Sequence, residues 1–93
     1  MLEGQIEKKV FALARRQGWY VRKVKFPGRV GPPDRLFAKV GRVVFIELKA
    51  TGKKVEPGST QDREIRRMKA AGIEVHWFDS VEAVCACLGL EPK

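Results

Sequence analysis

The sequence has 93 residues, with 19 Lys and Arg against 11 Asp and Glu, so its formal net charge is +8. This length suits one small domain with a single core, and a hydrophobic fraction of 44% with 32% charged residues excludes wholesale disorder. No apolar run approaches the ~20 residues of a membrane span. The surplus of positive charge predicts a polyanionic partner, most often nucleic acid, although an anionic membrane surface would also satisfy it.

The first half of the chain predicts a helix followed by three strands. Residues 3–17 carry apolar side chains at helical spacing. Residues 19–26 are β-branched and aromatic, which is typical of a strand. After a loop rich in Pro and Gly at 27–33, segments 34–39 and 42–49 read as two strands. Because only a two-residue turn separates them, we expect an antiparallel hairpin.

The second half predicts a helix, a strand and a short final helix. A loop at 50–58 precedes a helix that Ser59 caps, with Asp62 three residues later in a capping-box pattern. A strand at 73–78 and a helix capped by Asp79 follow. The order of elements is therefore α-β-β-β-α-β-α. It predicts an α/β fold in which a mixed sheet lies between helices.

The strand at 42–49 carries two charged residues in an apolar context. Glu47 and Lys49 are two residues apart, so they project from the same face of the strand. The opposite face is expected to enter the core through Val44, Ile46 and Leu48. A strand end that reaches solvent, with a surface ion pair, would explain Glu47 and Lys49 equally well.

The hairpin register brings a second carboxylate to Glu47. A turn after Lys39 pairs that residue with Arg42, and the same register pairs Asp34 with Glu47. Directly opposite residues have Cβ atoms about 4.5–5.5 Å apart, where like charges are destabilising. A divalent cation such as Mg²⁺, which is held by one or two carboxylates, would explain the pair. Alternatively, Arg35 or Arg42 neutralises one carboxylate and the register is shifted by one residue.

These residues resemble a known group of enzymes. Pro33-Asp34, a spacer, and Glu47-Leu48-Lys49 form the signature of the PD-(D/E)XK nuclease superfamily. The whole chain resembles the VRR-NUC family, through segments 31–36, 45–50 and 75–80 and through Gln61. The resemblance covers nearly all of residues 1–93 as a single domain and implies a restriction-endonuclease-like αβββαβ(α) core. One departure is Pro32, where an aliphatic residue often stands.

The resemblance implies metal-dependent hydrolysis of DNA phosphodiester bonds with Mg²⁺ or Mn²⁺ and no organic cofactor. Asp34 and Glu47 correspond to the metal ligands, together with the backbone carbonyl of Leu48. Lys49 corresponds to the catalytic lysine, as a base or as an electrostatic stabiliser. Gln61 matches the family's glutamine at the start of the second core helix.

Other residues carry weaker expectations. Glu3 matches a helical glutamate that approaches the metal in related resolvase-like enzymes, but Glu7 could serve instead. Gln61 could simply bind local backbone. His76 has no second histidine, and both tryptophans, Trp19 and Trp77, are expected in the core. The candidate phosphate-binding cations are Lys25, Arg29, Arg35, Lys53 and Lys54.

Two classes of function remain open. The first is a DNA endonuclease, which we expect to act as a homodimer on branched DNA such as four-way (Holliday) junctions. Cleavage of flaps or single strands by a monomer is its competitor. The second class is a non-catalytic nucleic-acid-binding module. The absence of an apolar leader at the start, together with only two cysteines, Cys85 and Cys87, favours the cytoplasm of a bacterial or phage-infected cell.

Overall fold

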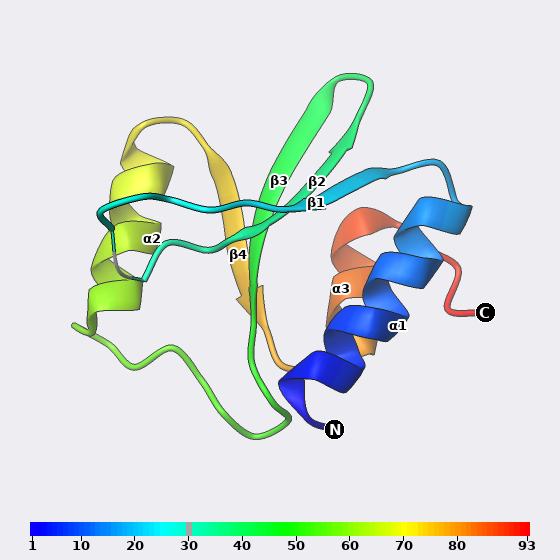
Figure 1. The fold of residues 1–93 in the computed structure, drawn as a ribbon, viewed down its shortest axis with the longest axis horizontal. Coiled ribbons are helices and arrows are strands. Elements are labelled where there is room, and N and C mark those ends of the chain that lie inside the picture. The colour runs from blue at the N-terminus through cyan, green and yellow to red at the C-terminus, as the bar shows by residue number, and fades with distance from the viewer. Residues whose placement is uncertain (30) are drawn as a thin grey trace.

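The computed structural model describes residues 1–29 and 31–93. Its elements follow the predicted order, with two layers of helices about one sheet (Figure 1). They are α1 (Glu3–Arg16), β1 (Tyr20–Lys23), β2 (Arg35–Lys39), β3 (Arg42–Leu48), α2 (Thr60–Ala70), β4 (Glu74–Phe78) and α3 (Val81–Leu88). No helix in the described residues is long and apolar enough to cross a membrane.

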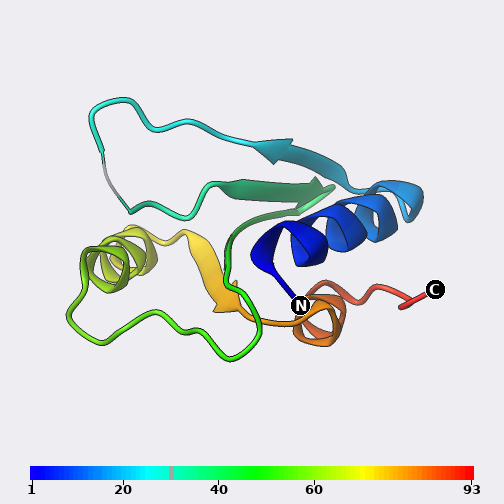
Figure 2. The same ribbon diagram turned by 60° about the horizontal axis from the view of Figure 1, so that its bottom comes forward.

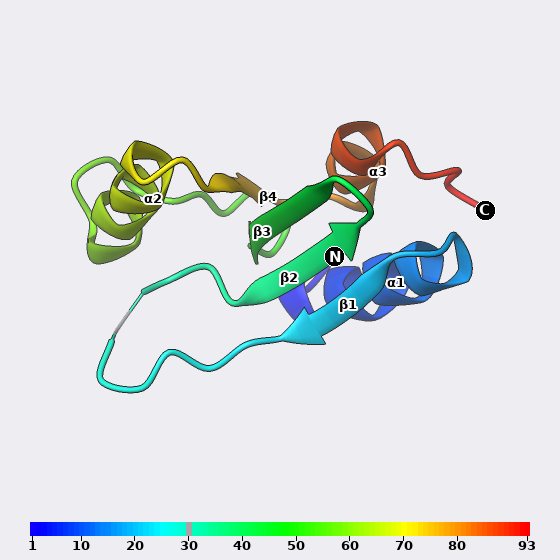
Figure 3. The same ribbon diagram turned by 90° about the horizontal axis from the view of Figure 1, so that it is seen from above.

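The four strands form a mixed sheet in the order β1-β2-β3-β4. The first three strands are antiparallel neighbours, and β4 runs parallel to β3. Because β3 and β4 are parallel, the chain needs a crossover between them, and α2 supplies it. Seen from above, the strands lie side by side with α2 beyond one end of the sheet (Figure 3). The predicted α/β fold with a mixed sheet between helices is confirmed.

The main core lies between the sheet and the helices α1 and α3, which pack side by side (Figure 2). The prediction for β3 is confirmed, because Val44, Ile46 and Leu48 are fully buried there. Their alternation along the strand leaves Phe45 and Glu47 on the other face. One face of β3 therefore stabilises the fold, and the other is available for a site.

The second face is partly covered by α2. Four buried residues form a smaller cluster there, and Phe45 packs against it: Val55, Ile65, Met68 and Val75. Ser59 caps this helix, as predicted, by accepting a hydrogen bond from the Asp62 amide at 3.1 Å. Because α2 begins beside the end of β3, it brings a polar first turn to Glu47.

Two local predictions are wrong. The first strand ends at Lys23, although the Val24 amide still donates to the Asp34 carbonyl at 2.7 Å before the chain turns away toward Pro27. The final helix is capped by Ser80, whose hydroxyl accepts from the Ala83 amide at 3.1 Å. Asp79 instead accepts from the Gly52 amide at 3.0 Å. Its carboxylate therefore fixes the loop after β3 and does not cap α3.

Candidate active site

The hairpin register brings Asp34 and Glu47 to the same end of the sheet. Pairing runs from Lys39 with Arg42 to Arg35 with Ile46, as predicted. Asp34 directly precedes β2, so it is the next residue along this register and faces Glu47. The alternative of a register shifted by one residue is excluded.

Asp34 presents an oxygen whose hydrogen-bonding capacity is unused. Its Oδ1 atom is buried and has no hydrogen-bond partner within the described chain. Arg35 Nη1 lies 3.2 Å from it, an electrostatic contact that lacks hydrogen-bond geometry. Leaving a buried acceptor unpaired costs about 1–3 kcal/mol, and more for a charged group. This oxygen is therefore suited to a cation outside the chain.

Glu47 is a buried carboxylate beside another one. It is 7% exposed at the end of β3. Burial raises the pKa of Glu47 to about 7; the nearby Arg35 opposes this rise and the charge of Asp34 adds to it. Its Oε2 atom accepts a hydrogen bond from Gln61 Nε2 at 3.1 Å. Without a bound metal ion, the buried surroundings of Glu47 disfavour the ionised form of its carboxylate.

Arg35 links α1 to the site. Its side chain is buried, and it donates from Nε to Glu7 at 2.8 Å and from Nη2 to Glu3 at 2.7 Å. Burial lowers the pKa of Arg35, but its bonds to the two glutamates outweigh that effect, so the net shift is upward. Arg35 was expected to bind DNA phosphates. It binds the carboxylates of its own chain instead, and a buried guanidinium offers little surface to a phosphate.

Both candidate glutamates of α1 reach this arginine. The charge of Glu3 also contributes to the raised pKa of Glu47, so Glu3 lies near the carboxylate pair. Glu7 additionally contacts Lys23 at 3.6 Å. The structure thus places Glu3 at the edge of the site and Glu7 farther along the helix toward β1.

The remaining predicted cations lie on the strand end and loops that follow β1 and β3. Lys49 follows β3, where its amide donates to the Phe78 carbonyl at 2.9 Å, and its charge favours the ionised form of Glu47. Lys25 and Arg29 line an open pocket of about 520 Å³ together with Asp34. Arg29 is also paired with Glu64 of α2. Two further predicted cations lie exposed on the loop after β3, namely Lys53 and Lys54.

The sequence assigns Trp77 to the core, but the structure places it beside Glu47. It pairs with Glu47 in the parallel ladder between β3 and β4, and Val75, two residues earlier, packs under α2. Trp77 therefore shares the face of Glu47, and it is 36% exposed. The expectation of a core residue is wrong for Trp77 and correct for Trp19, which is 7% exposed. The signal in the sequence was the alternation of side chains along a strand, which puts Trp77 on the same face of β4 as Val75.

Two comparisons with known proteins bear on this arrangement. A protein of Acyrthosiphon pisum secondary endosymbiont phage 1, named "Putative nuclease p44", is 42% identical over 79 residues, which are 84% of this chain and 83% of the phage protein. A solved structure described as a VRR_NUC domain superposes with a TM-score of 0.80 at 30% identity, covering 94% of each chain. The chain belongs to the VRR-NUC family. A search for matching family models found none.

The donors of this VRR-NUC site fit a hard divalent cation. Asp34 and Glu47 supply carboxylate oxygens, of which Asp34 Oδ1 accepts no hydrogen bond within the described chain, and oxygen is the ligand atom that Mg²⁺ and Mn²⁺ prefer. Leu48 ends β3 beside them, with its side chain in the core. Membership of the family and similarity to a phage nuclease support a nuclease.

Proposed function

We propose that this chain is a DNA endonuclease that hydrolyses phosphodiester bonds with Mg²⁺ or Mn²⁺. The observation that carries the proposal is the buried Oδ1 of Asp34, which has no hydrogen-bond partner in the described chain and only an ion-pair contact with Arg35, next to the desolvated carboxylate of Glu47. A protein that only binds nucleic acid gains nothing from two carboxylates near a phosphate, because they repel it. A protein that holds a metal ion at that place needs them.

Asp34, Glu47 and the backbone carbonyl of Leu48 would hold the ion. The ion, when bound, lowers the pKa of a water molecule and neutralises charge on the phosphate. Lys49 would stabilise the negative charge that develops on the phosphoryl oxygens, or orient the attacking water. Its position two residues after Glu47 puts both side chains on one face of the strand.

Gln61 and Glu3 would support this set without touching the phosphate. Gln61 holds one oxygen of Glu47 through its amide and thereby fixes the orientation of the carboxylate. Glu3 acts through Arg35, which also contacts Asp34. Fixing a metal ligand in this way is commonly worth 10- to 100-fold in metal affinity or activity.

DNA would approach along the loops around the carboxylates. Lys25 and Arg29 line the pocket beside Asp34, and Lys53 and Lys54 follow β3. Contacts of this kind position the phosphate backbone and carry no base sequence. We therefore expect recognition of DNA shape, and branched DNA such as a four-way junction as the preferred substrate, in the cytoplasm of a bacterial or phage-infected cell.

Cleavage assays with a panel of DNAs test the proposal. Linear, nicked, flapped and four-way-junction substrates are incubated with Mg²⁺, Mn²⁺ or a chelator. We expect cleavage that the chelator abolishes and that Glu47→Ala removes, with Glu56→Ala, an exposed carboxylate on the loop after β3, as the matched control. Tight DNA binding without cleavage in either metal would instead favour the non-catalytic binding module.

The oligomeric state separates the two expected substrate classes. Symmetric cutting of a junction needs two active sites, which a two-fold dimer supplies. Light scattering at the concentration of the cleavage assay should therefore show a homodimer. A monomer that cuts flaps and leaves the junction intact would contradict the junction preference and leave the nuclease proposal standing.

A further inference from the structure

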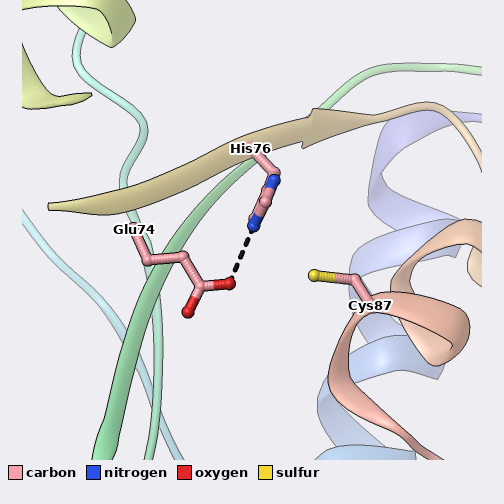
Figure 4. A group of neighbouring side chains, drawn as sticks. All are labelled: Glu74, His76 and Cys87. Carbon is pink, nitrogen blue, oxygen red and sulfur yellow. Dashed lines mark hydrogen bonds and ion pairs between the residues drawn. The ribbon is translucent and has the colours of Figure 1, made fainter.

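A second group of metal-ligating side chains lies on the opposite face of the sheet from Asp34 and Glu47. Glu74 and His76 are two residues apart on β4, and Cys87 projects from α3 toward them (Figure 4). One ligand atom from each residue lies within 4.8 Å of the other two. All three residues are half-buried, so the group is accessible without being fully solvated.

The donor set of this group differs from that of the proposed nuclease site. It offers one carboxylate oxygen, one imidazole nitrogen and one sulfur. Thiolate and imidazole ligands select Zn²⁺ and similar borderline-soft cations over Mg²⁺. The imidazole is already oriented, since its ring stacks on Phe78 at a centroid distance of 5.5 Å and Nε2 lies 2.9 Å from Glu74 Oε2. Three protein ligands leave a fourth position of a tetrahedral zinc site open to water.

A cationic group of the chain already occupies this place. Arg42 donates from Nη2 to Glu74 Oε2 at 2.7 Å and contacts Cys87 Sγ from the same nitrogen at 3.7 Å. Its Nε atom donates to the other oxygen of Glu74 at 2.9 Å. The carboxylate and the sulfur are thus arranged about a positive centre. The pair is bidentate and therefore stronger than most surface ion pairs, but its side chains are 36% and 34% exposed, so water can solvate the guanidinium when a divalent ion displaces it.

We propose that Glu74, His76 and Cys87 bind Zn²⁺ or a cation of the same class in exchange for the Arg42 guanidinium. Cys87 gives up its thiol proton to solvent as its sulfur bonds to the ion, and Arg42 turns away into water. The bound ion links β4 to α3. This site is independent of the carboxylate pair and of the proposed nuclease activity.

Titration with Co²⁺ under a non-chelating reductant tests the site. A cobalt ion bound by Cys87 gives a near-ultraviolet charge-transfer band that requires a thiolate ligand, whereas cobalt bound at Asp34 and Glu47 gives none. We expect the band to appear in the unaltered chain, to be lost when Zn²⁺ is added and to persist with Mg²⁺. The band should disappear in Cys87→Ser and remain in Cys85→Ser, the matched control, since Cys85 lies on the same helix outside the group.

The Arg42→Ala variant gives the most discriminating test of the site. Removing the competing cation should tighten Co²⁺ binding by ~10-fold or more, because the ion no longer displaces two charge-assisted hydrogen bonds. Thermal unfolding should show a higher midpoint with Zn²⁺ in this variant and no such change in the double variant with Cys87→Ser. The proposal is overturned if Arg42→Ala, shown by circular dichroism to be folded, gives no thiolate band, or if the band survives Cys87→Ser. In either case, the group is an ion pair with a neighbouring thiol and no metal site.

Discussion

Gln61, in the first turn of α2, donates a hydrogen bond from Nε2 to Oε2 of Glu47 at the end of β3, across 3.1 Å. The bond joins the helix to the strand at the point where the buried carboxylate needs a donor. The bond also stabilises the orientation in which the polar first turn of α2 faces the sheet. The sequence left open whether this glutamine binds local backbone, and the structure shows that it binds Glu47.

Replacing Gln61 should impair catalysis through Glu47. In Gln61→Ala, the carboxylate loses the donor that orients it. We expect the rate of DNA cleavage to fall by about 10- to 100-fold, with a matching loss of metal affinity. The control is Gln17→Ala, because Gln17 bonds to the backbone of Glu91 at the far end of α1. Unchanged cleavage in Gln61→Ala would show that the bond is structural only.

The pKa of Glu47 predicts an unusual dependence of stability on pH in the metal-free protein. Burial raises this pKa from 4.5 to about 7 in the folded state. Between these values, the folded state retains a proton that the unfolded state has lost. The free energy of unfolding should therefore fall as the pH rises from about 4.5 to about 7, by at most on the order of 3 kcal/mol.

Urea denaturation across this pH range measures the effect. The control variant is Glu47→Gln, which keeps the shape of the side chain and cannot ionise. The difference in unfolding free energy between the two proteins isolates Glu47 from other titrating groups. We expect Glu47→Gln to be the more stable protein above pH 7 without metal, and saturating Mg²⁺ to stabilise only the unaltered protein. A difference that does not vary with pH would contradict the raised pKa.

Lys49 should act on the transition state and not on binding. Lys49→Ala is expected to retain metal and DNA binding and to lose cleavage by about 10²–10³-fold, since removing one well-placed electrostatic group costs this much. Single-turnover cleavage and fluorescence anisotropy measure the two quantities separately. Lys8→Ala, an exposed lysine on α1 outside the proposed DNA contacts, is the matched control for loss of one positive charge. A loss of DNA affinity in proportion to activity would make Lys49 a phosphate anchor.

The sequence predicted those parts of the site that local rules determine. A two-residue turn sets the hairpin register, and the register alone brings Asp34 to Glu47. The surroundings of Arg35 depend instead on α1, which precedes it by some 30 residues and docks by tertiary packing. No local sequence pattern indicates how α1 docks against the sheet. The same limit explains Trp77, because its exposure is set by tertiary packing around β4.

The burial of Arg35 predicts that its loss lowers the free energy of unfolding. Arg35→Ala leaves the carboxylates of Glu3 and Glu7 without their shared partner next to the core. Because the side chains of Glu3 and Glu7 are 45% and 24% exposed, water can solvate the charges left behind, and the cost should stay below the ~3–5 kcal/mol of a fully buried pair, at about 1–3 kcal/mol. Urea denaturation at neutral pH should show a loss of this order, against little change for Arg22→Ala, an exposed arginine on the neighbouring strand β1. A loss below about 1 kcal/mol would place Arg35 among ordinary surface ion pairs.

Trp77 should distinguish unpaired from paired DNA if the chain is the proposed nuclease. It lies next to Glu47 in the β3–β4 ladder and is 36% exposed, so an unstacked base near the scissile phosphate could lie against its ring. Stacking of a base on an aromatic ring is worth about 1–3 kcal/mol, which is roughly a 5- to 150-fold change in affinity. Trp77→Ala should weaken binding of junctions and flaps by this factor and leave binding of continuous duplex nearly unchanged.

Two control variants make this last prediction specific. Trp77→Phe retains an aromatic face and should keep most of the affinity for branched DNA. Tyr20→Ala removes another exposed aromatic ring, on β1 at the opposite edge of the sheet, and should change neither binding nor cleavage. Because binding is measured in Ca²⁺ or without metal, the result does not depend on catalysis. Equal losses for duplex and branched DNA in Trp77→Ala would mean that the ring supports the fold or the backbone contacts and does not read unpaired bases.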